Sequence, residues 1–389
     1  MIIIIKKIKV YSPEYLGEKD VVIVGEKFEG IYDNVDIPDT FINLDVIDGK
    51  GKIIFPGFID GHVHITGGGG EKGFSSRTPE IRVRDLITAG ITTVVGCLGT
   101  DNVCRDICGL VAKCKALKEV GINSYCYTGS YEIPIKTLTS SIKKDIMMIE
   151  EVLGVGEVAL SDNRSSQPTY DQFVNTVAQA RVGGLLSGKS GIVNVHLGGG
   201  KKNLEYLSEL INETEIPANQ LLPTHINRNE ELFMKGLEYV SLGGYIDLTT
   251  SSDPKHLEPG ELLASEGLKR YLENGLPIEH ITFSSDGNGS MPIFDDEGNT
   301  VGIGICSVKS LFGEVRKAIL ELNIPIETAI KVITVNIAKM LSLKDRGEIK
   351  ENFSADFVIV DDKNLEIVDV YSRGKALFRD GKLLIREDF

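Results

Sequence analysis

Two histidines of this sequence stand two residues apart, in the segment Asp60-Gly61-His62-Val63-His64. Residues two apart on a β-strand point to the same face, so both imidazoles can reach one metal ion. A pair of this kind also occurs as a purely structural feature. The pair therefore indicates a metal site only if further ligands lie near it.

Further metal-binding side chains stand in or at the ends of other apolar segments: His196, His225, Asp286 and Glu157. Four of the six histidines thus follow one pattern. The other two fall in connecting regions and are interpreted as surface residues: His256 and His280. Four imidazoles and two carboxylates can hold two divalent metal ions that share one carboxylate and a water. This set predicts metal-dependent hydrolysis.

The middle of the chain alternates apolar, β-branched segments with amphipathic ones. The predicted strands are residues 53–65, 91–99, 123–133, 157–162, 191–197, 221–225, 245–250 and 281–286. The predicted helices are residues 79–89 (with Thr78 as the N-cap), 103–120, 142–153, 170–186, 202–211, 229–242 and 260–274. Such repeats predict an α/β fold, a (β/α)8 TIM-type barrel, rather than an open sheet. In a barrel the carboxyl ends of the strands converge on one mouth, which would gather the six side chains.

The two ends of the chain carry short strand patterns of another kind. At the start these are residues 2–10, 21–24, 30–32 and 41–44, and at the end residues 357–360, 367–372, 375–378 and 382–385. Asp380-Gly381 is a hairpin turn signal between the last two. We expect residues 1–52 and 346–389 to combine into one small β domain, from which a barrel of residues 53–345 is inserted.

The net charge of −14 argues against nucleic acid or an anionic membrane as the main partner. No apolar run reaches the roughly 18 residues that a membrane span needs. The positive charge of Lys6 and Lys7 follows the first apolar residues, the reverse of the order in a signal peptide. We therefore expect a cytoplasmic protein that acts on a small molecule.

Two other patterns carry weaker signals. Gly183-Gly184-Leu185-Leu186-Ser187-Gly188-Lys189-Ser190 fits the phosphate-loop pattern, but a helix precedes it and a strand follows, which is the wrong order for binding phosphate. Cys104 and Cys108 are four apart in a predicted helix, which leaves a soft metal site open. Buried free thiols are the favoured interpretation of all six cysteines.

Several segments resemble known families. Pro56-Gly57-Phe58-Ile59-Asp60-Gly61-His62-Val63-His64 resembles the first-strand signature of the amidohydrolase superfamily. The resemblance to the isoaspartyl (β-aspartyl) dipeptidases is closer and runs through nearly the whole chain. Its segments include Gly67-Gly68-Gly69-Gly70-Glu71, Gly99-Thr100-Asp101, Tyr127-Thr128-Gly129-Ser130-Tyr131, Ser161-Asp162-Asn163-Arg164-Ser165, Pro223-Thr224-His225-Ile226-Asn227-Arg228 and Ser284-Ser285-Asp286-Gly287-Asn288-Gly289-Ser290.

This resemblance implies hydrolysis of β-aspartyl dipeptides by a homo-oligomer, with an octamer as the expected assembly. It implies two divalent ions, zinc by analogy, held by His62, His64, His196, His225 and Asp286 together with the residue at position 157. Asp286 would take the proton of the attacking water and pass it to the leaving amine. Tyr131 would polarise the carbonyl of the bond that is cleaved.

One position departs from the family pattern. The isoaspartyl dipeptidases carry a carboxylated lysine where this chain has Glu157. Both groups end in a negatively charged carboxylate, so we expect Glu157 to bridge the two metals directly. Because Glu is shorter, a site that keeps only one tightly bound metal stays open as the alternative.

A β-aspartyl dipeptide carries one ammonium and two carboxylates, and the resemblance supplies groups for each. Glu71 would bind the ammonium. Arg164 and Arg228 would bind the carboxylate of the leaving residue. The other carboxylate would meet Thr100, Ser290 and the backbone near Gly69. Two alternatives remain: a cyclic amide hydrolase such as a dihydroorotase or hydantoinase, and a non-catalytic relative with the same barrel.

Overall fold

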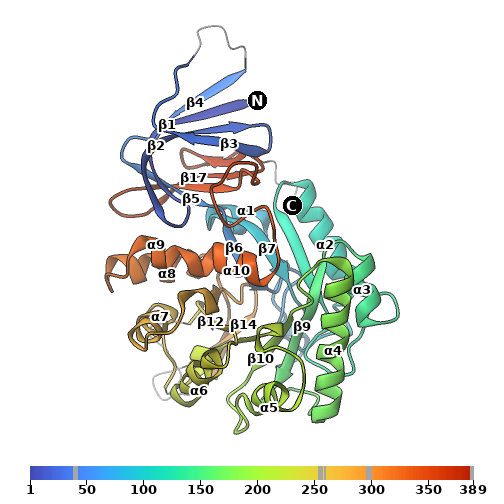
Figure 1. Cartoon of the computed structure of the whole chain (residues 1–389). Coiled ribbons are helices and arrows are strands. Elements are labelled where there is room, and N and C mark those ends of the chain that lie inside the picture. Colours follow the sequence, from blue (N-terminus) through green and yellow to red (C-terminus); the bar gives the residue numbers. More distant parts are fainter. Residues whose placement is uncertain (38–42, 253–256, 258–259, 295–299, 386–389) are drawn as a thin grey trace.

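The computed structural model describes residues 1–37, 43–252, 257, 260–294 and 300–385. Figure 1 shows a β-sheet region at the top, built from the blue and red ends of the chain, above a larger α/β region. The upper sheet has nine strands in the order β19-β18-β17-β16-β5-β1-β2-β3, with β4 paired to β1. Their bounds are β1 (Ile2–Tyr11), β2 (Tyr15–Val24), β3 (Lys27–Tyr32), β4 (Leu44–Asp48), β5 (Lys52–Pro56), β16 (Phe357–Asp361), β17 (Ile367–Ser372), β18 (Lys375–Arg379) and β19 (Lys382–Leu383).

The two chain ends join where β5 runs antiparallel to β16, with Phe357 opposite Pro56. Ile3 and Ile5 of β1 lie in the core of this sheet, and a register shift between Ile5 and Ile8 brings Ile8 and Val10 into the same core. The turn predicted at Asp380-Gly381 does join β18 to β19.

The lower region is a curled parallel sheet whose strands follow chain order. Six strands form one sheet and two form a separate pair. The six are β6 (Phe58–Val63), β7 (Ile91–Gly96), β8 (Asn123–Thr128), β9 (Val152–Leu160), β10 (Val193–Leu197) and β11 (Leu221–Thr224), and the pair is β12 (Ile246–Thr249) with β13 (Ile281–Ser284). In the described part of the chain the closed eight-strand ladder that we predicted is therefore not complete.

Side chains cross the two gaps in this ladder. Between β11 and β12, the hydroxyl of Thr224 donates to Oδ2 of Asp247 at 2.7 Å. Between β13 and β6, the amide of Ser285 donates to Oδ1 of Asp60 at 3.1 Å, and a single bridge joins Val63 to Gly287. The pair β12–β13 thus lies between β11 and β6, and the carboxyl ends of all eight strands face one side.

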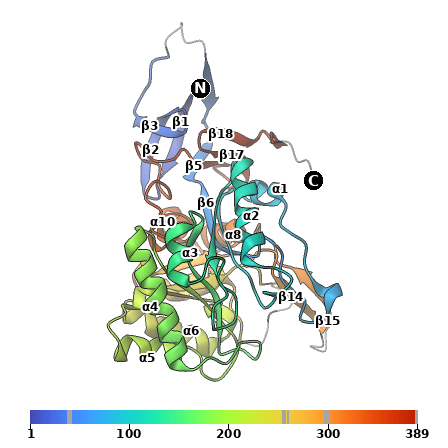
Figure 2. The same ribbon diagram turned by 90° about the vertical axis from the view of Figure 1, so that its right-hand side faces the viewer.

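Helices alternate with these strands and lie outside them, as α2, α3 and α4 do in Figure 2. Their bounds are α1 (Val83–Thr88), α2 (Ile107–Glu119), α3 (Ile142–Met148), α4 (Tyr170–Ser187), α5 (Glu205–Glu213), α6 (Glu230–Ser241), α7 (Ala264–Glu273), α8 (Ser310–Leu320), α9 (Ile326–Ala329) and α10 (Val335–Met340). A hairpin that we did not predict, β14 (Ser290–Phe294) with β15 (Thr300–Ile305), projects from the lower region in Figure 2. Among the described residues, no helix combines the length and the apolar character that crossing a membrane requires.

Several predicted elements were wrong in their bounds: the helix expected at residues 142–153 ends at Met148, and the strand expected at residues 157–162 is β9, which begins at Val152. Three further errors have a cause in the structure. The strand expected at residues 53–65 is two strands, β5 in the upper sheet and β6 in the lower one, separated by Gly57. A Cβ at Gly57 would lie 2.2 Å from Oγ1 of Thr92, so this close passage needs glycine. The helix expected at residues 79–89 starts only at Val83, because Thr78 is not its cap: the Thr78 hydroxyl accepts from the Gly68 amide and lies 2.6 Å from the Asn288 carbonyl.

The third concerns the helix expected at residues 103–120, which begins at Ile107 after the N-cap Asp106. Cys104 therefore lies outside the helix, and it does not share a helical face with Cys108. Both of these cysteines are exposed, so the prediction of buried thiols was wrong for them and holds for the other four.

The phosphate-loop pattern at residues 183–190 forms the end of α4, where Gly188 adopts a left-handed conformation with φ of 69°. The ammonium of Lys189 donates to the carbonyls of Ile146, Ile149 and Val152 at 2.5–2.9 Å. Lysine at a helix C-terminus satisfies carbonyls that have no partner within the helix. The lysine that a nucleotide would need is thus occupied at the end of α3.

Candidate metal centre

The predicted metal ligands lie together at the carboxyl ends of the strands. They come from different elements: His62 from β6, Glu157 from β9 and His196 from β10, while His64, His225 and Asp286 follow β6, β11 and β13. All four imidazoles and the Glu157 carboxylate are buried. The converging ends of the parallel strands therefore bring together residues that are up to 224 positions apart in sequence.

Glu157 lies at the centre of this group. Its Oε1 is 3.3 Å from Nε2 of His64. Its Oε2 lies 3.4 Å from Nε2 of His62, 3.2 Å from Nδ1 of His196 and 3.8 Å from Nε2 of His225. Burial alone would raise the pKa of Glu157, but the surrounding imidazoles outweigh burial and hold the pKa well below its usual range. Glu157 is thus an anion that faces histidines on two sides.

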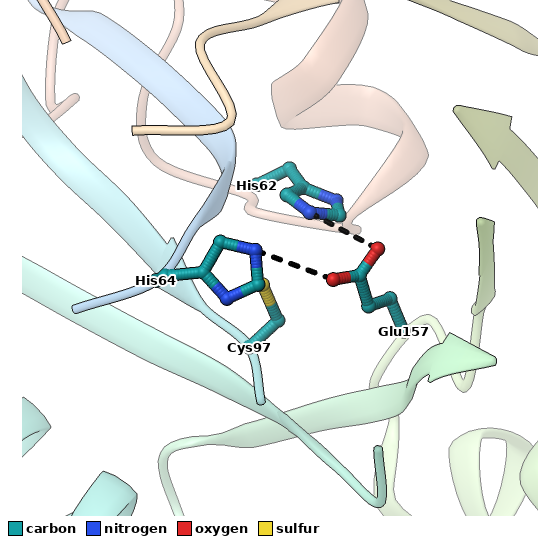
Figure 3. A group of neighbouring side chains, drawn as sticks. All are labelled: His62, His64, Cys97 and Glu157. Carbon is teal, nitrogen blue, oxygen red and sulfur yellow. Dashed lines mark hydrogen bonds and ion pairs between the residues drawn. The ribbon is translucent and has the colours of Figure 1, made fainter. Parts of the chain in front are cut away.

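Cys97 also belongs to this group, and our sequence analysis missed it. One ligand atom from each of His62, His64, Cys97 and Glu157 can be chosen so that all four lie within 4.8 Å of one another. Figure 3 shows the thiol beside the His64 ring, on the side of Glu157. A second group of this kind consists of Glu157, His196 and His225. The two groups share only Glu157.

The donor atoms of the site fit metal ions. His62 Nε2, Glu157 Oε1 and Asp286 Oδ1 are buried polar atoms without a hydrogen-bond partner. Such atoms are costly unless something else satisfies them. Zinc–ligand bonds of about 2.0–2.3 Å place neighbouring ligands of a tetrahedral ion roughly 3.3–3.8 Å apart. The 3.2–3.8 Å separations around Glu157 match that spacing.

Neighbouring side chains orient the imidazoles. Nδ1 of His62 lies 3.1 Å from the Asn194 carbonyl oxygen, which can only accept, so Nδ1 carries the proton and Nε2 presents a lone pair to the centre. Nδ1 of His225 lies 2.6 Å from the Thr249 hydroxyl, which orients the His225 ring. Burial lowers the pKa of His62, but the nearby Cys97 and Glu157 raise it well above its ordinary value. The site therefore favours positive charge, which a metal ion can supply in place of protons.

Asp286 follows β13, the strand next to β6, and faces the same imidazoles. Its Oδ1 lies 3.1 Å from Nε2 of His64 and 3.6 Å from Nε2 of His62. Burial raises its pKa, but the histidines lower it further, to about 2, so the carboxylate is ionised at neutral pH. Asp286 and His225 both have positive φ, 52° and 63°. Non-glycine residues in this conformation cluster at functional sites.

Tyr131 follows β8 and places its hydroxyl 2.9 Å from Nδ1 of His196. Burial raises the pKa of Tyr131 well above its ordinary value, so the phenol stays protonated and can donate a hydrogen bond. The Arg164 guanidinium lies 5.5 Å from the centre of the Tyr131 ring. Tyr131 thus contacts His196 through its hydroxyl and the Arg164 guanidinium through its ring.

The predicted substrate residues Glu71, Thr100 and Arg164 lie next to one another. Oε1 of Glu71 accepts from the Thr100 hydroxyl at 3.0 Å and lies 3.7 Å from a guanidinium nitrogen of Arg164. All three line one pocket that also includes Gly69. Ser290 is beside Gly69, since a Cβ on that glycine would lie 3.2 Å from the Ser290 Cβ. These five residues form one surface beside the metal ligands.

Arg164 is also held by Asp162 through two bonds of 3.0 and 2.8 Å, and the same carboxylate lies 2.9 Å from Nε2 of His196. Our sequence analysis gave Asp162 no role, although it lies in the segment quoted for the family. Arg228 lies near this group, with its Nε donating to the Leu197 carbonyl at 3.1 Å.

The two remaining histidines take no part in this site as far as the structure describes them. Nδ1 of His280 lies 2.9 Å from the Gly244 carbonyl, at the opposite ends of β12 and β13. His256 lies outside the described residues.

A model of the amidohydrolase family matches residues 53–377. The chain belongs to the amidohydrolase family. This match confirms the superfamily that we expected from the first-strand signature. It also covers the whole of the curled sheet and all of the predicted metal ligands.

Among solved structures, a β-aspartyl dipeptidase from Fervidobacterium islandicum AW-1 in complex with β-Asp-Leu is 45% identical, with the comparison covering all of both chains and a TM-score of 0.92. This confirms the expected resemblance to that group. A D-hydantoinase structure is 17% identical over 99% of this chain and 97% of its own, with a TM-score of 0.69, and shares the fold. An adenine deaminase from Halalkalibacterium halodurans is 24% identical over 95% of this chain. The chain spans only 55% of that relative's length.

Proposed function

We propose that this amidohydrolase is a metal-dependent dipeptidase that cleaves β-aspartyl dipeptides. The observation that carries the proposal is the placement of Glu71 and Arg164 in one pocket next to six metal-ligating side chains. A metal centre alone fits many amide hydrolases. An anion and a cation at its edge fit a small substrate that is itself charged at both ends. The 45% identity to a β-aspartyl dipeptidase over the whole chain supports the same conclusion.

In this proposal Glu71 binds the α-ammonium of the substrate, and Thr100, Ser290 and the backbone of Gly69 bind the carboxylate beside it. Arg164 and Arg228 bind the carboxylate of the leaving residue. Arg164 and Glu71 are 3.7 Å apart, which is a weak ion pair. A bound substrate would replace it with two stronger pairs, one between Glu71 and the ammonium and one between Arg164 and a carboxylate.

The metal centre in this proposal contains two divalent ions, zinc by analogy with the family. His62 and His64 hold one ion, His196 and His225 hold the other, and Glu157 bridges them. When bound, the two ions supply a water that is acidic enough to attack near neutral pH. The four distances around Glu157 support its bridging role, because its two oxygens face different histidines.

Two residues move or hold protons in the reaction. Asp286, ionised at neutral pH, accepts the proton of the attacking water on Oδ1 and passes it to the departing amine. Tyr131 donates its phenolic proton in a hydrogen bond to the oxygen of the scissile carbonyl and stabilises the negative charge that develops there. Its raised pKa keeps that proton available.

We further propose a two-part architecture, with residues 1–52 and 346–389 as a small β domain and residues 53–345 as a (β/α)8 barrel. The strand order and the side-chain links across both gaps support the barrel. We propose that the protein works in the cytoplasm as a homo-oligomer such as an octamer, without nucleic-acid or membrane partners.

The decisive experiment compares turnover of β-Asp-Leu, α-Asp-Leu and dihydroorotate by the metal-free and zinc-loaded protein. We expect zinc-dependent cleavage of β-Asp-Leu only. Faster turnover of dihydroorotate would favour the cyclic amide hydrolases, and adenine belongs in the panel because of the deaminase relatives. No turnover of any substrate by zinc-loaded protein would favour a non-catalytic relative.

A further inference from the structure

Cys97 is a buried thiol at the carboxyl end of a barrel strand. It follows β7 directly, and its side chain is inaccessible to solvent. Its Sγ lies 3.8 Å from Nδ1 of His64 and belongs to the donor group of His62, His64 and Glu157. A cysteine in the core of a protein is usually surrounded by apolar groups, whereas this one faces two imidazoles and a carboxylate.

The atoms opposite the thiol point to an ion between them. His62 Nε2 and Glu157 Oε1 are buried and have no hydrogen-bond partner. Both belong to the same donor group as Cys97. Figure 3 shows the imidazoles, the thiol and the carboxylate around one central space, with Cys97 beside the His64 ring. Four donors of these types are a usual set for a tetrahedral zinc ion.

The chemistry of sulfur agrees with this geometry. Thiolate, rather than thiol, is the form that binds metals, and a buried thiolate needs a cation next to it. The position of Cys97 within the donor group of His62, His64 and Glu157 would give its sulfur such a cation.

We propose that Cys97 is a sulfur ligand of the metal ion held by His62 and His64. On binding, Cys97 loses its proton to solvent and its Sγ donates an electron pair to the ion. The inference rests on the proposed two-metal centre and makes its two positions chemically unequal. One position has a sulfur ligand, and the other has only the nitrogen and oxygen donors of His196, His225 and Glu157. Soft ions such as cadmium will therefore prefer the position that contains Cys97.

A different role for the thiol makes a different prediction. Sγ could accept a hydrogen bond from Nδ1 of His64 and only orient that ring. Outer-shell partners of this kind change metal affinity by about 10–100-fold when they are removed. A direct ligand must change the affinity by more than that, and it must also change the spectrum of the bound ion.

The test is a titration of metal-free protein with cobalt, followed by absorption. We expect a sulfur-to-cobalt charge-transfer band in the near ultraviolet in the wild-type protein. Cys97→Ser should lose that band and bind the first cobalt ion more than ~100-fold more weakly. Cys114→Ser is the matched control, because Cys114 is a buried free thiol that belongs to neither group of metal-binding side chains, and its Sγ donates to the Tyr125 carbonyl at 3.3 Å. The control should keep both the band and the affinity.

An unchanged band in Cys97→Ser, or an affinity loss of ~100-fold or less, would overturn the inference. Cadmium-113 NMR of the wild-type protein gives an answer that needs no variant, since a sulfur ligand shifts the resonance strongly downfield. Cleavage of β-Asp-Leu by a protein whose cobalt form lacks the band would refute the Cys97 ligand and leave the proposed function standing. The band without cleavage of β-Asp-Leu would support the Cys97 ligand and refute the proposed function.

Discussion

Replacing Glu157 by glutamine tests the proposed bridge most directly, because it removes one negative charge and keeps the shape. That charge lies 3.2–3.8 Å from nitrogens of four histidines. Two unit charges ~3.5 Å apart attract by about 5 kcal/mol at an effective dielectric constant of ~20. The amide oxygen of glutamine and a water that enters the site can replace part of this attraction. If they replace half of it, the binding free energy of each metal ion weakens by about 2.4 kcal/mol, or roughly 50-fold in affinity.

This loss can be measured through protein stability. A metal present at 1,000 times its dissociation constant stabilises the folded state by about 4 kcal/mol, and a 50-fold weaker site would provide only about 2 kcal/mol. We therefore expect Glu157→Gln to lose about half of the zinc-induced gain in unfolding free energy. Metal analysis after dialysis should show fewer than two equivalents of zinc per chain.

The matched control is Glu151→Gln. Glu151 is also a buried glutamate and lies just before β9, but its carboxylate pairs with Lys115 and Lys118. This variant should keep two equivalents of zinc even if it is less stable. Two tightly held equivalents in Glu157→Gln would refute the bridge, and one tight equivalent in the wild-type protein would favour the single-metal alternative.

Three further predictions concern single side chains. Tyr131→Phe should lower kcat for β-Asp-Leu by roughly 10²–10³-fold with unchanged metal content, and an unchanged kcat would remove Tyr131 from the mechanism. Glu71→Gln should lower kcat/KM for β-Asp-Leu by about 10–100-fold, since it weakens a charge-assisted bond to the substrate ammonium. Equal cleavage of N-acetylated β-Asp-Leu, which has no ammonium, by the wild-type protein would contradict this role of Glu71. Burial raises the pKa of Asp247 to about 6, so the folded protein keeps a proton that the unfolded chain releases above about pH 4. Asp247 should therefore lower the unfolding free energy by about 3 kcal/mol as pH rises from 4 to 6. Asp247→Asn should remove this contribution from thermal melts and leave the slope that comes from Asp60, whose pKa burial raises to about 7.

The sequence predicts elements well where local chemistry decides them. The Asp380-Gly381 turn and the apolar run of β1 needed no knowledge of distant residues. The break between β5 and β6 carries a local turn signal, Pro56-Gly57, but our prediction joined the two strands because both flanking segments are apolar. Position 57 needs glycine because the Thr92 side chain leaves no room for a Cβ, and only folding brings Thr92 close to it. Likewise, Thr78 is an acceptable helix cap until the Gly68 amide donates to its hydroxyl oxygen and the Asn288 carbonyl, 210 residues away, accepts its proton.

Within the site, what the sequence predicts depends on two things: the type of each residue and its position relative to the end of a strand. His62 and His64 are recognisable from their spacing. His196 in β10, His225 after β11 and Asp286 after β13 are recognisable because they stand at the ends of apolar runs. Cys97 occupies the same kind of position, directly after β7, yet composition pointed away from it because buried free thiols are common and no cysteine pair was present. Cys114 is buried in helix α2, whereas Cys97 follows a strand that ends at the mouth and faces two histidines. The rule that chemistry gathers at the carboxyl ends of barrel strands therefore applies to sulfur donors as well as to nitrogen and oxygen donors. Applied to every donor type, it would have found the thiol from the sequence alone.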